Sequence, residues 1–124
     1  MAIKILLVED DQILAKLYQT KFQKEGFEIQ LAYDGQEGLD KLKSFEPGLI
    51  ILDLIMPKVD GFSFLERFRA DPVLGKKKIP ILVLSNLGQD ADIKRAQELG
   101  AADYFVKADI SLGQMIEKVR KYLK

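Results

Sequence analysis

The 124-residue chain contains no cysteine and no histidine. Their absence excludes disulfides, thiolate nucleophiles and the serine-histidine-aspartate or cysteine-histidine arrangements of many hydrolases. It also removes the usual ligands of zinc and haem iron. Carboxylates, lysines and hydroxyl groups remain for chemistry, together with cations that prefer oxygen ligands.

The chain also lacks an excess of charge of either sign and a long hydrophobic run. Nineteen basic and nineteen acidic residues cancel, so no overall field attracts nucleic acid or an anionic membrane. The apolar opening from Ile5 to Val8 is too short for a signal peptide or a membrane span. We therefore expect a cytoplasmic protein that does not insert into membranes and contacts no nucleic acid directly. The run Lys76-Lys77-Lys78 is interpreted as a solvated loop.

The length of the chain suits one domain over residues 1–124. With 48% hydrophobic residues, the chain can bury a core without disulfides or a structural metal. A second domain would not fit. No linker or output segment follows the last predicted helix, so we expect output through partner proteins unless the sequence is a piece of a longer one.

The most informative stretch runs from Leu49 to Gly61. Four consecutive apolar residues without helical spacing predict a strand buried on both faces, and this run ends on Asp53. Pro57 and Gly61 then force a turn. In a parallel sheet, ligands and chemistry are found at the carboxyl ends of strands, whereas an acid inside the strand would be an unpaired buried charge. Asp53 is therefore the first candidate functional residue.

Strand and helix patterns alternate along the whole chain. Strands are predicted over residues 3–8, 27–32, 49–53, 79–84 and 103–106, and helices over residues 11–26, 34–45, 60–68, 91–99 and 111–123. In the first helix, apolar residues recur at intervals of four in two series, Ile13/Leu17 and Leu14/Tyr18/Phe22. The fourth helix has few apolar residues.

Polar residues mark where several helices begin. Asp11 is a candidate N-cap of the first helix, Asp34 with Glu37 is a capping pair for the second, and Ser111 with Gln114 forms a capping box for the last.

This alternation predicts an α/β protein with a five-stranded parallel sheet, right-handed crossovers and five helices on both faces. We predict the flavodoxin-like strand order 2-1-3-4-5, in which the winding reverses between strands one and three. Glu9, Asp10 and Asp53 then converge on one crevice, with Ser85 and Lys107 on its far side.

Three carboxylates in one crevice repel each other, by roughly 4 kcal/mol per pair at about 4 Å for an effective dielectric constant of about 20. Either one acid is protonated or a cation lies among them. Mg²⁺ with several retained waters fits few oxygen ligands on one side better than a caged Ca²⁺. A half-open metal site favours a substrate oxygen such as that of a phosphoryl group, and a carboxylate can accept such a group.

Simpler interpretations exist for each of these residues. Glu9 and Asp10 fit helix caps, and Asp53 fits a surface Asx-turn. Ser85 alone would be a turn residue, and Lys107 alone a solvated lysine. The functional hypothesis rests on all of these positions lying at the carboxyl ends of strands.

Four segments carry a resemblance to a known family across the whole chain: Leu6-Leu7-Val8-Glu9-Asp10-Asp11, Leu52-Asp53-Leu54-Ile55-Met56-Pro57 with Asp60-Gly61, Leu84-Ser85, and Gly100-Ala101-Ala102-Asp103-Tyr104-Phe105-Val106-Lys107. In this order and spacing they resemble the receiver domain of two-component response regulators, and in particular the chemotaxis regulators. The strand order given above is also that of a chemotaxis member of this family.

The resemblance implies a phosphorylation switch rather than a conventional turnover enzyme. Asp53 would accept a phosphoryl group from a phosphohistidine on a sensor histidine kinase or phosphotransfer protein. Asp10 and Asp53 would bind Mg²⁺ together with the backbone carbonyl of Ile55, and Glu9 would assist through water. Lys107 would pair with a phosphoryl oxygen.

The resemblance also implies a route from the site to a downstream partner. The Ser85 hydroxyl would bond another phosphoryl oxygen and free space into which Tyr104 turns. This movement would couple the site to a partner-binding surface made by the fourth helix, fifth strand and fifth helix.

The chain departs from the family pattern at two positions. Ala108 follows Lys107 where the family usually has proline, often with a cis bond; a non-proline cis bond costs about 2.5 to 4 kcal/mol, so we expect a trans peptide and a reshaped loop. Asn86 follows Ser85 where the family keeps a small residue, and it would narrow phosphate access or add a hydrogen bond. Ile55 and Leu87 flank the expected path of a hydrolysing water and cannot orient it, so we expect a long-lived phosphoryl group.

Three other functions are considered. A phosphatase of the haloacid dehalogenase type would place a second aspartate two residues after the nucleophile, where this chain has Ile55. A receiver-like interaction module without phosphorylation is suggested by Asn86 and Ala108 alone. A flavin site is weaker still, because acids stand where a phosphate cradle needs donors.

Overall fold

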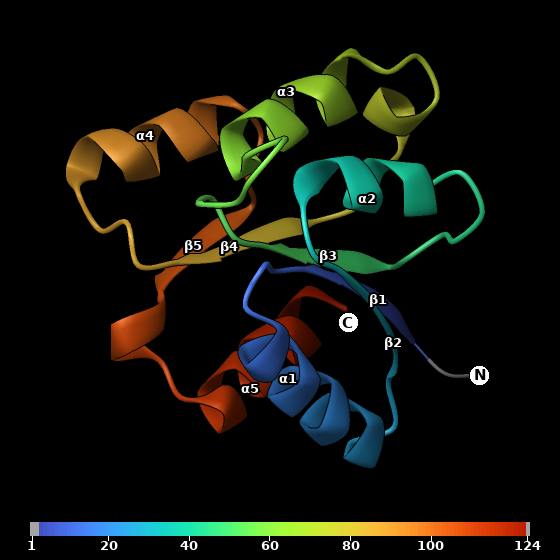
Figure 1. The fold of residues 1–124 in the computed structure, drawn as a ribbon, viewed down its shortest axis with the longest axis vertical. Coiled ribbons are helices and arrows are strands. Elements are labelled where there is room, and N and C mark those ends of the chain that lie inside the picture. Colours follow the sequence, from blue (N-terminus) through green and yellow to red (C-terminus); the bar gives the residue numbers. More distant parts are fainter. Residues whose placement is uncertain (1–2, 124) are drawn as a thin grey trace.

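The computed structural model describes residues 3–123, in which a central sheet lies between two layers of helices (Figure 1). Within these residues the sheet has five parallel strands in the order β2-β1-β3-β4-β5, so the predicted topology is confirmed. The strands are β1 (Lys4–Val8), β2 (Glu28–Ala32), β3 (Leu49–Leu52), β4 (Ile81–Ser85) and β5 (Asp103–Val106).

The helices divide between the two faces of the sheet (Figure 1). One face is covered by α1 (Gln12–Lys24) and α5 (Leu112–Tyr122), and the other by α2 (Gly35–Lys41), α3 (Gly61–Ala70) and α4 (Asp90–Glu98). Two short 3₁₀ helices complete the described elements: η1 (Leu74–Lys76) lies between α3 and β4, and η2 (Lys107–Asp109) lies between β5 and α5. Among residues 3–123, no helix is both long and apolar enough to cross a membrane.

Alternation along the strands produces two cores. Ile5 and Leu7 of β1 pack with α1 and α5, whereas Leu6 and Val8 pack with the helices of the other face. This follows from the twofold side-chain period of a strand. Strands β1, β3 and β4 therefore contain continuous apolar runs, because both of their faces are buried.

Most predicted helix starts are confirmed. Asp11 accepts a hydrogen bond from the backbone N–H of Leu14 at 3.1 Å, and Asp34 accepts one from the N–H of Glu37 at 2.8 Å. Ser111 and Gln114 form the complete capping box. The pair of Asp34 and Glu37 differs from this capping box in one respect. Glu37 accepts from the N–H of Tyr33 at 2.5 Å, one residue before the cap, and not from the N–H of the cap residue itself.

The structure shows which face of α1 packs on the sheet and corrects the extent of α2. Of the two apolar series in α1, the one with Leu14, Tyr18 and Phe22 packs on the sheet, whereas Ile13 and Leu17 are 78% and 57% exposed. Adjacent helix positions point about 100° apart, so both series cannot face the sheet. Helix α2 ends at Lys41, earlier than predicted, although the following residues 42 and 45 are still buried.

Candidate functional site

The carboxyl ends of β1 and β3 lie side by side. Val8 and Leu52, the last residues of these strands, are in register, and the backbone N–H of Asp53 donates to the carbonyl of Val8 at 2.9 Å. One carboxylate oxygen from each of Glu9, Asp10 and Asp53 lies within 4.8 Å of the other two. The structure therefore brings the three predicted acids together in one cluster.

Lys107 reaches this acidic cluster from the end of β5. Its Nζ lies 3.1 Å from Oδ2 of Asp53 and 2.5 Å from Oε1 of Glu9. Burial lowers the pKa of Lys107, but the hydrogen bond to Glu9 and the negative charges of both acids outweigh burial, so its pKa is raised overall. Lys107 therefore stays a cation between two buried carboxylates.

The surroundings of Glu9 change its pKa. Burial raises its pKa from 4.5 to about 7, the hydrogen bond from Lys107 opposes this change, and the charge of Asp53 adds to it. Its second oxygen accepts from the N–H of Asp11 at 3.2 Å. A single lysine thus does not fully compensate the cluster, and an additional cation would be favourable there.

The carboxylate of Asp53 is held in a fixed direction. Its Oδ1 accepts hydrogen bonds from the backbone N–H groups of Leu54 at 2.7 Å and Ile55 at 3.4 Å, while its Oδ2 faces Lys107. The side chain is 6% exposed. Asp53 is thus buried and held by backbone N–H groups through Oδ1, while Oδ2 faces the ammonium group of Lys107.

Ser85 and Tyr104 meet at Leu87. Ser85, the last residue of β4, is fully buried, and its hydroxyl accepts from the N–H of Leu87 at 3.3 Å. The Tyr104 hydroxyl donates to the carbonyl of Leu87. Leu87, in the loop after β4, therefore links the hydroxyl of Ser85 to the half-buried Tyr104 of β5.

The donor set fits Mg²⁺. The three acids offer only carboxylate oxygens as ligand atoms. Glu9 and Asp53 are buried, whereas Asp10 is exposed, which leaves room for waters that the ion retains. That the backbone carbonyl of Ile55, in the loop after Asp53, joins these oxygens as a ligand stays a prediction.

The sequence analysis missed the role of Gly35. Its N–H donates to the carbonyl of Val59 at 3.0 Å, which ties α2 to the loop that follows Asp53. The Asp34-Gly35 dipeptide was a turn signal that pointed to a special backbone position. Its partner on the loop could not be recognised without the fold.

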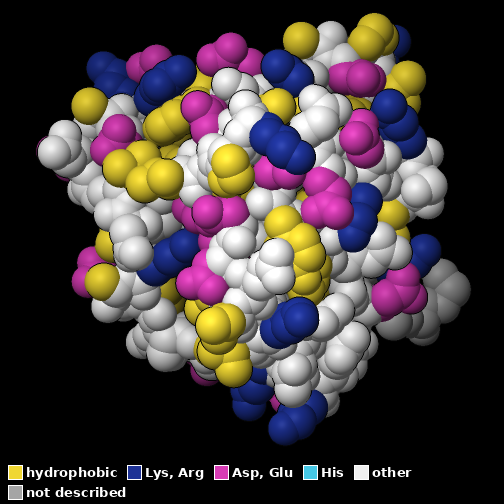
Figure 2. Space-filling model, in the orientation of Figure 1, with side chains coloured by type: hydrophobic (Ala, Val, Ile, Leu, Met, Phe, Trp, Pro, Cys, Tyr) yellow, Lys and Arg dark blue, Asp and Glu magenta, His cyan; other side chains and the backbone are white. Residues whose placement is uncertain are grey.

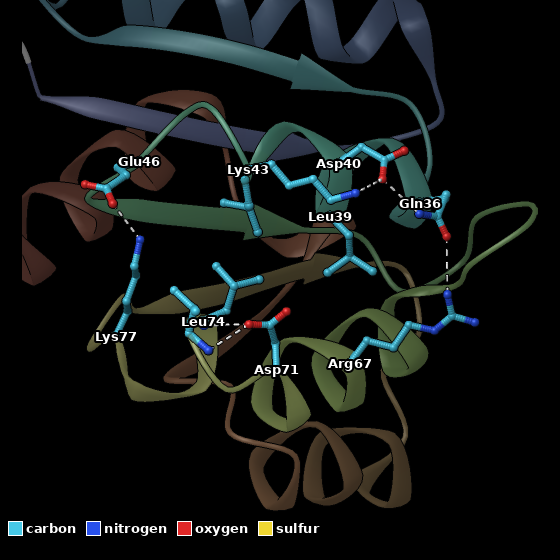
Figure 3. Close-up of a pocket in the computed structure, with 11 residues that line it drawn as sticks. Gln36, Leu39, Asp40, Lys43, Glu46, Arg67, Asp71, Leu74 and Lys77 are labelled. Atoms are coloured by element: carbon cyan, nitrogen blue, oxygen red, sulfur yellow. Dashed lines mark hydrogen bonds and ion pairs between the residues drawn. The ribbon is translucent and has the colours of Figure 1, made fainter.

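A cavity of about 520 Å³ lies away from the acidic cluster, between α2, α3 and residues 73–77 (Figure 3). Leu39, Leu42 and Leu74 supply its apolar lining. Four of its charged groups form two ion pairs, Lys77 with Glu46 at 2.6 Å and Lys43 with Asp40 at 3.5 Å (Figure 3). Lys77, from the predicted solvated run, thus pairs with an acid. Acidic and basic side chains are also interspersed over the face drawn in Figure 2.

The fold and the site together define a class of protein. The family model "Response regulator receiver domain" matches residues 5–120. The chain belongs to this family, and the predicted resemblance is confirmed.

The curated relatives include longer regulators. The chain is 36% identical over 121 residues to the DNA-binding dual master transcriptional regulator RpaA of Synechocystis sp., covering 98% of this chain and 49% of that protein. It is 35% identical over 104 residues to the alkaline phosphatase synthesis transcriptional regulatory protein PhoP of Bacillus subtilis, covering 84% of this chain and 42% of that protein. The chain thus spans about half the length of the curated relatives it matches.

Solved structures show the same fold. A receiver domain of the Francisella response regulator 1452 matches with a TM-score of 0.86 and 28% identity, over 97% of this chain and 95% of that chain. The Vibrio cholerae chemotaxis protein CheY4 matches with a TM-score of 0.89 and 24% identity, over 98% of this chain and 99% of that chain, which concerns the fold alone.

Family membership decides several expectations. Receiver domains are signalling switches rather than conventional enzymes, they act with histidine kinases, and they generally bind Mg²⁺ at an acidic pocket. The expectation that the protein contacts no nucleic acid is not supported, because one relative is named as DNA-binding. The expectation of a single domain stays a prediction.

Proposed function

We propose that this protein is a switch that is activated by phosphorylation of Asp53. The observation that carries the proposal is the Asp53 carboxylate itself: it is buried, oriented by the N–H of Leu54, and paired at 3.1 Å with Lys107 inside a cluster of acids. This geometry presents one carboxylate to an incoming phosphoryl group.

The donor is a phosphohistidine of a sensor histidine kinase or phosphotransfer protein. A carboxylate oxygen of Asp53 attacks the phosphorus, a phosphorus–oxygen bond forms, and the phosphorus–nitrogen bond breaks. The electron pair of the broken bond stays on the donor histidine nitrogen. Lys107 then pairs with a phosphoryl oxygen in place of Oδ2 of Asp53.

Magnesium would be held by Asp10, Asp53 and the carbonyl of Ile55, with Glu9 assisting through water. Bound there, the ion supplies positive charge that offsets the charge of the phosphoryl oxygens. The raised pKa of Glu9 supports this assignment, because it is the direction expected where several acids share the charge of one lysine.

The response of the switch runs through Ser85 and Tyr104. The Ser85 hydroxyl turns from the N–H of Leu87 to a phosphoryl oxygen, and the loop after β4 then changes its contact with the Tyr104 hydroxyl. The shared partner of the two side chains, Leu87, supports this coupling. The surface of α4, β5 and α5 then binds the downstream protein in one state better than in the other.

The donor protein approaches over apolar side chains beside the acidic cluster. Ile13 and Leu17 are exposed on α1, which begins directly after the acids of β1, and Ile55 is 57% exposed two residues after Asp53. Exposed large apolar residues near a reaction site favour a contact with another protein.

Phosphorylation is tested by incubating the protein with Mg²⁺ and acetyl phosphate and measuring intact mass. We expect one added phosphoryl group on the wild type and none on Asp53→Ala. Asp109→Ala, which removes an exposed acid of η2, is the matched control and should be labelled as the wild type is. An unlabelled wild type would favour a phosphorylation-independent interaction module, and labelling of Asp53→Ala would refute the assignment.

The same material tests the lifetime of the phosphoryl group. Ile55 and Leu87 offer no polar group to orient an attacking water, so loss of the label should be slow. Ile55→Asn should accelerate the loss, because an amide can hold a water. Rapid loss from the wild type would contradict the expectation.

A further inference from the structure

The loop between β3 and α3, residues 53–60, decides how the phosphoacceptor is presented. The N–H groups of Leu54 and Ile55 donate to Oδ1 of Asp53 at 2.7 and 3.4 Å. The same loop carries the carbonyl of Ile55, the proposed magnesium ligand. A shift of this backbone would therefore move both the carboxylate and the carbonyl.

This loop is held by a segment far away in the sequence. The N–H of Gly35, the first residue of α2, donates to the carbonyl of Val59 at 3.0 Å. A Cβ added to Gly35 would overlap with that carbonyl oxygen and lie 2.8 Å from Cγ1 of Val59. Glycine is thus required here by the close approach of two backbones.

A second contact ties the same two segments. Asp34 caps α2 and lies 3.8 Å from Nζ of Lys58, which precedes Val59. Lys58 has a φ of 65°, in the left-handed region that side chains rarely adopt. A left-handed residue of the loop therefore lies next to Val59, where α2 contacts it.

We infer that Gly35 is a positioning residue for the phosphoacceptor site. By allowing the start of α2 to lie against Val59, it fixes the backbone of residues 53–59, and so sets the affinity of the site for Mg²⁺ and the rate at which Asp53 is phosphorylated. Gly35 itself touches neither the ion nor the phosphoryl group. This inference rests on the proposed function.

The test compares two glycine substitutions that create the same kind of clash. Gly35→Ala forces the loop away from α2. Gly75→Ala also places a Cβ into a backbone carbonyl, that of Arg69, but in η1 and outside the site. Gly113→Ala adds a Cβ that meets no atom within 4 Å outside its adjoining residues and the nearby backbone of its own helix, among residues 3–123, and controls for the substitution itself.

Three quantities are measured on each variant: the Mg²⁺ dissociation constant by calorimetry, the urea unfolding midpoint, and the rate of phosphorylation by acetyl phosphate. We expect Gly35→Ala to weaken Mg²⁺ binding by about tenfold, as is typical when the support of a metal ligand is lost, and to slow phosphorylation. Gly75→Ala should lower the midpoint but keep the wild-type Mg²⁺ affinity. Equal Mg²⁺ affinities in Gly35→Ala and the wild type, or equal losses in both clashing variants, would overturn the inference.

A measurement on the wild type keeps the inference falsifiable if Gly35→Ala does not fold. During a Mg²⁺ titration followed by amide NMR, the resonance of Gly35 should shift with the same midpoint as those of Leu54 and Ile55, whereas that of Gly75 should not. A Gly35 resonance unchanged at saturation would overturn the inference. Absence of Mg²⁺ binding by the wild type would refute the proposed function and the inference with it.

Discussion

Two parts of the molecule differ in how firmly they are packed: the site side, which comprises β1 and β3, and the other side, which comprises β5 and α4. In β3 all four residues are buried, and in β1 the buried run extends from Ile5 to the end of the strand. In β5 all four residues are half-buried. Helix α4, beside β5, buries Ala96 among residues 90–98, and its cap residue Gln89 makes no side-chain capping bond within residues 3–123.

This contrast suits a switch. The acids directly follow the firmly packed strands β1 and β3, which suits a site whose side chains need fixed positions. In the proposed switch, the half-buried strand and the loosely packed helix would carry the surface that changes. Regions with few buried apolar contacts open at lower free-energy cost than the core. In the proposed switch, the site side would therefore serve as a frame against which the other side moves.

The largest expected effect comes from truncating an isoleucine on each side, one fully buried and one half-buried. Ile51→Ala in β3 should lower the free energy of unfolding by about 4 kcal/mol, because the residue is fully buried and leaves a cavity. Ile93→Ala in α4, which is half-buried, should cost about 1 kcal/mol. Urea unfolding measures both values. Equal losses would show that the two sides are packed equally well.

Removing the charge of Lys107 tests whether the site side depends on ion pairing. Lys107→Met leaves two buried carboxylates without their cation, and breaking such a pair usually costs about 3 to 5 kcal/mol. We expect about 2 kcal/mol near neutral pH, because Glu9, whose pKa is already about 7, takes up a proton instead. Urea unfolding without Mg²⁺ measures this loss.

The matched control for that variant is Lys94→Met, which removes an exposed lysine from α4. It should change stability by less than about 0.5 kcal/mol. A Lys107→Met protein as stable as this control would mean that the lysine does not compensate the acids.

Hydrogen exchange examines the contrast residue by residue. Amides of α4 should exchange at least about tenfold faster than those of β1 and β3, which corresponds to roughly 1.4 kcal/mol in opening free energy. Phosphorylation of Asp53 should alter exchange mainly between residues 85 and 106. Changes spread evenly over β1 and β3 would contradict the division into frame and moving side.

The same sequence features predicted the topology of the sheet and the convergence of the site acids. A buried apolar run followed by a carboxylate is recognisable without neighbours, since it reflects the burial of the strand itself. Alternation of strands and helices then limits the possible topologies. The acids at the ends of β1 and β3 follow from these two features.

What the sequence could not predict depends on orientation between elements. Helix α1 has two apolar series, and only their packing in the fold shows that Ile13 and Leu17 face outward. The contact of Gly35 with Val59 joins segments that no local pattern connects. The same holds for Leu87, whose backbone accepts from Tyr104 and donates to Ser85.

The smallest expected effect concerns the connection between the two sides. Tyr104→Phe removes the hydroxyl that donates to Leu87 and should cost about 1 kcal/mol of stability, the usual net contribution of one hydrogen bond. Because Leu87 also donates to Ser85, the variant should still be phosphorylated at Asp53 but show a weaker change of exchange in α4. Hydrogen exchange before and after phosphorylation measures this difference.

Tyr122→Phe is the control for that loss. Its hydroxyl bonds to Asp103 at 2.8 Å, at the start of β5 and away from Leu87, so its removal should cost a similar amount of stability and leave the response of α4 intact. If both variants respond to phosphorylation as the wild type does, Tyr104 only packs against its side of the sheet. The signal would then pass from Ser85 to α4 through the backbone of the loop alone.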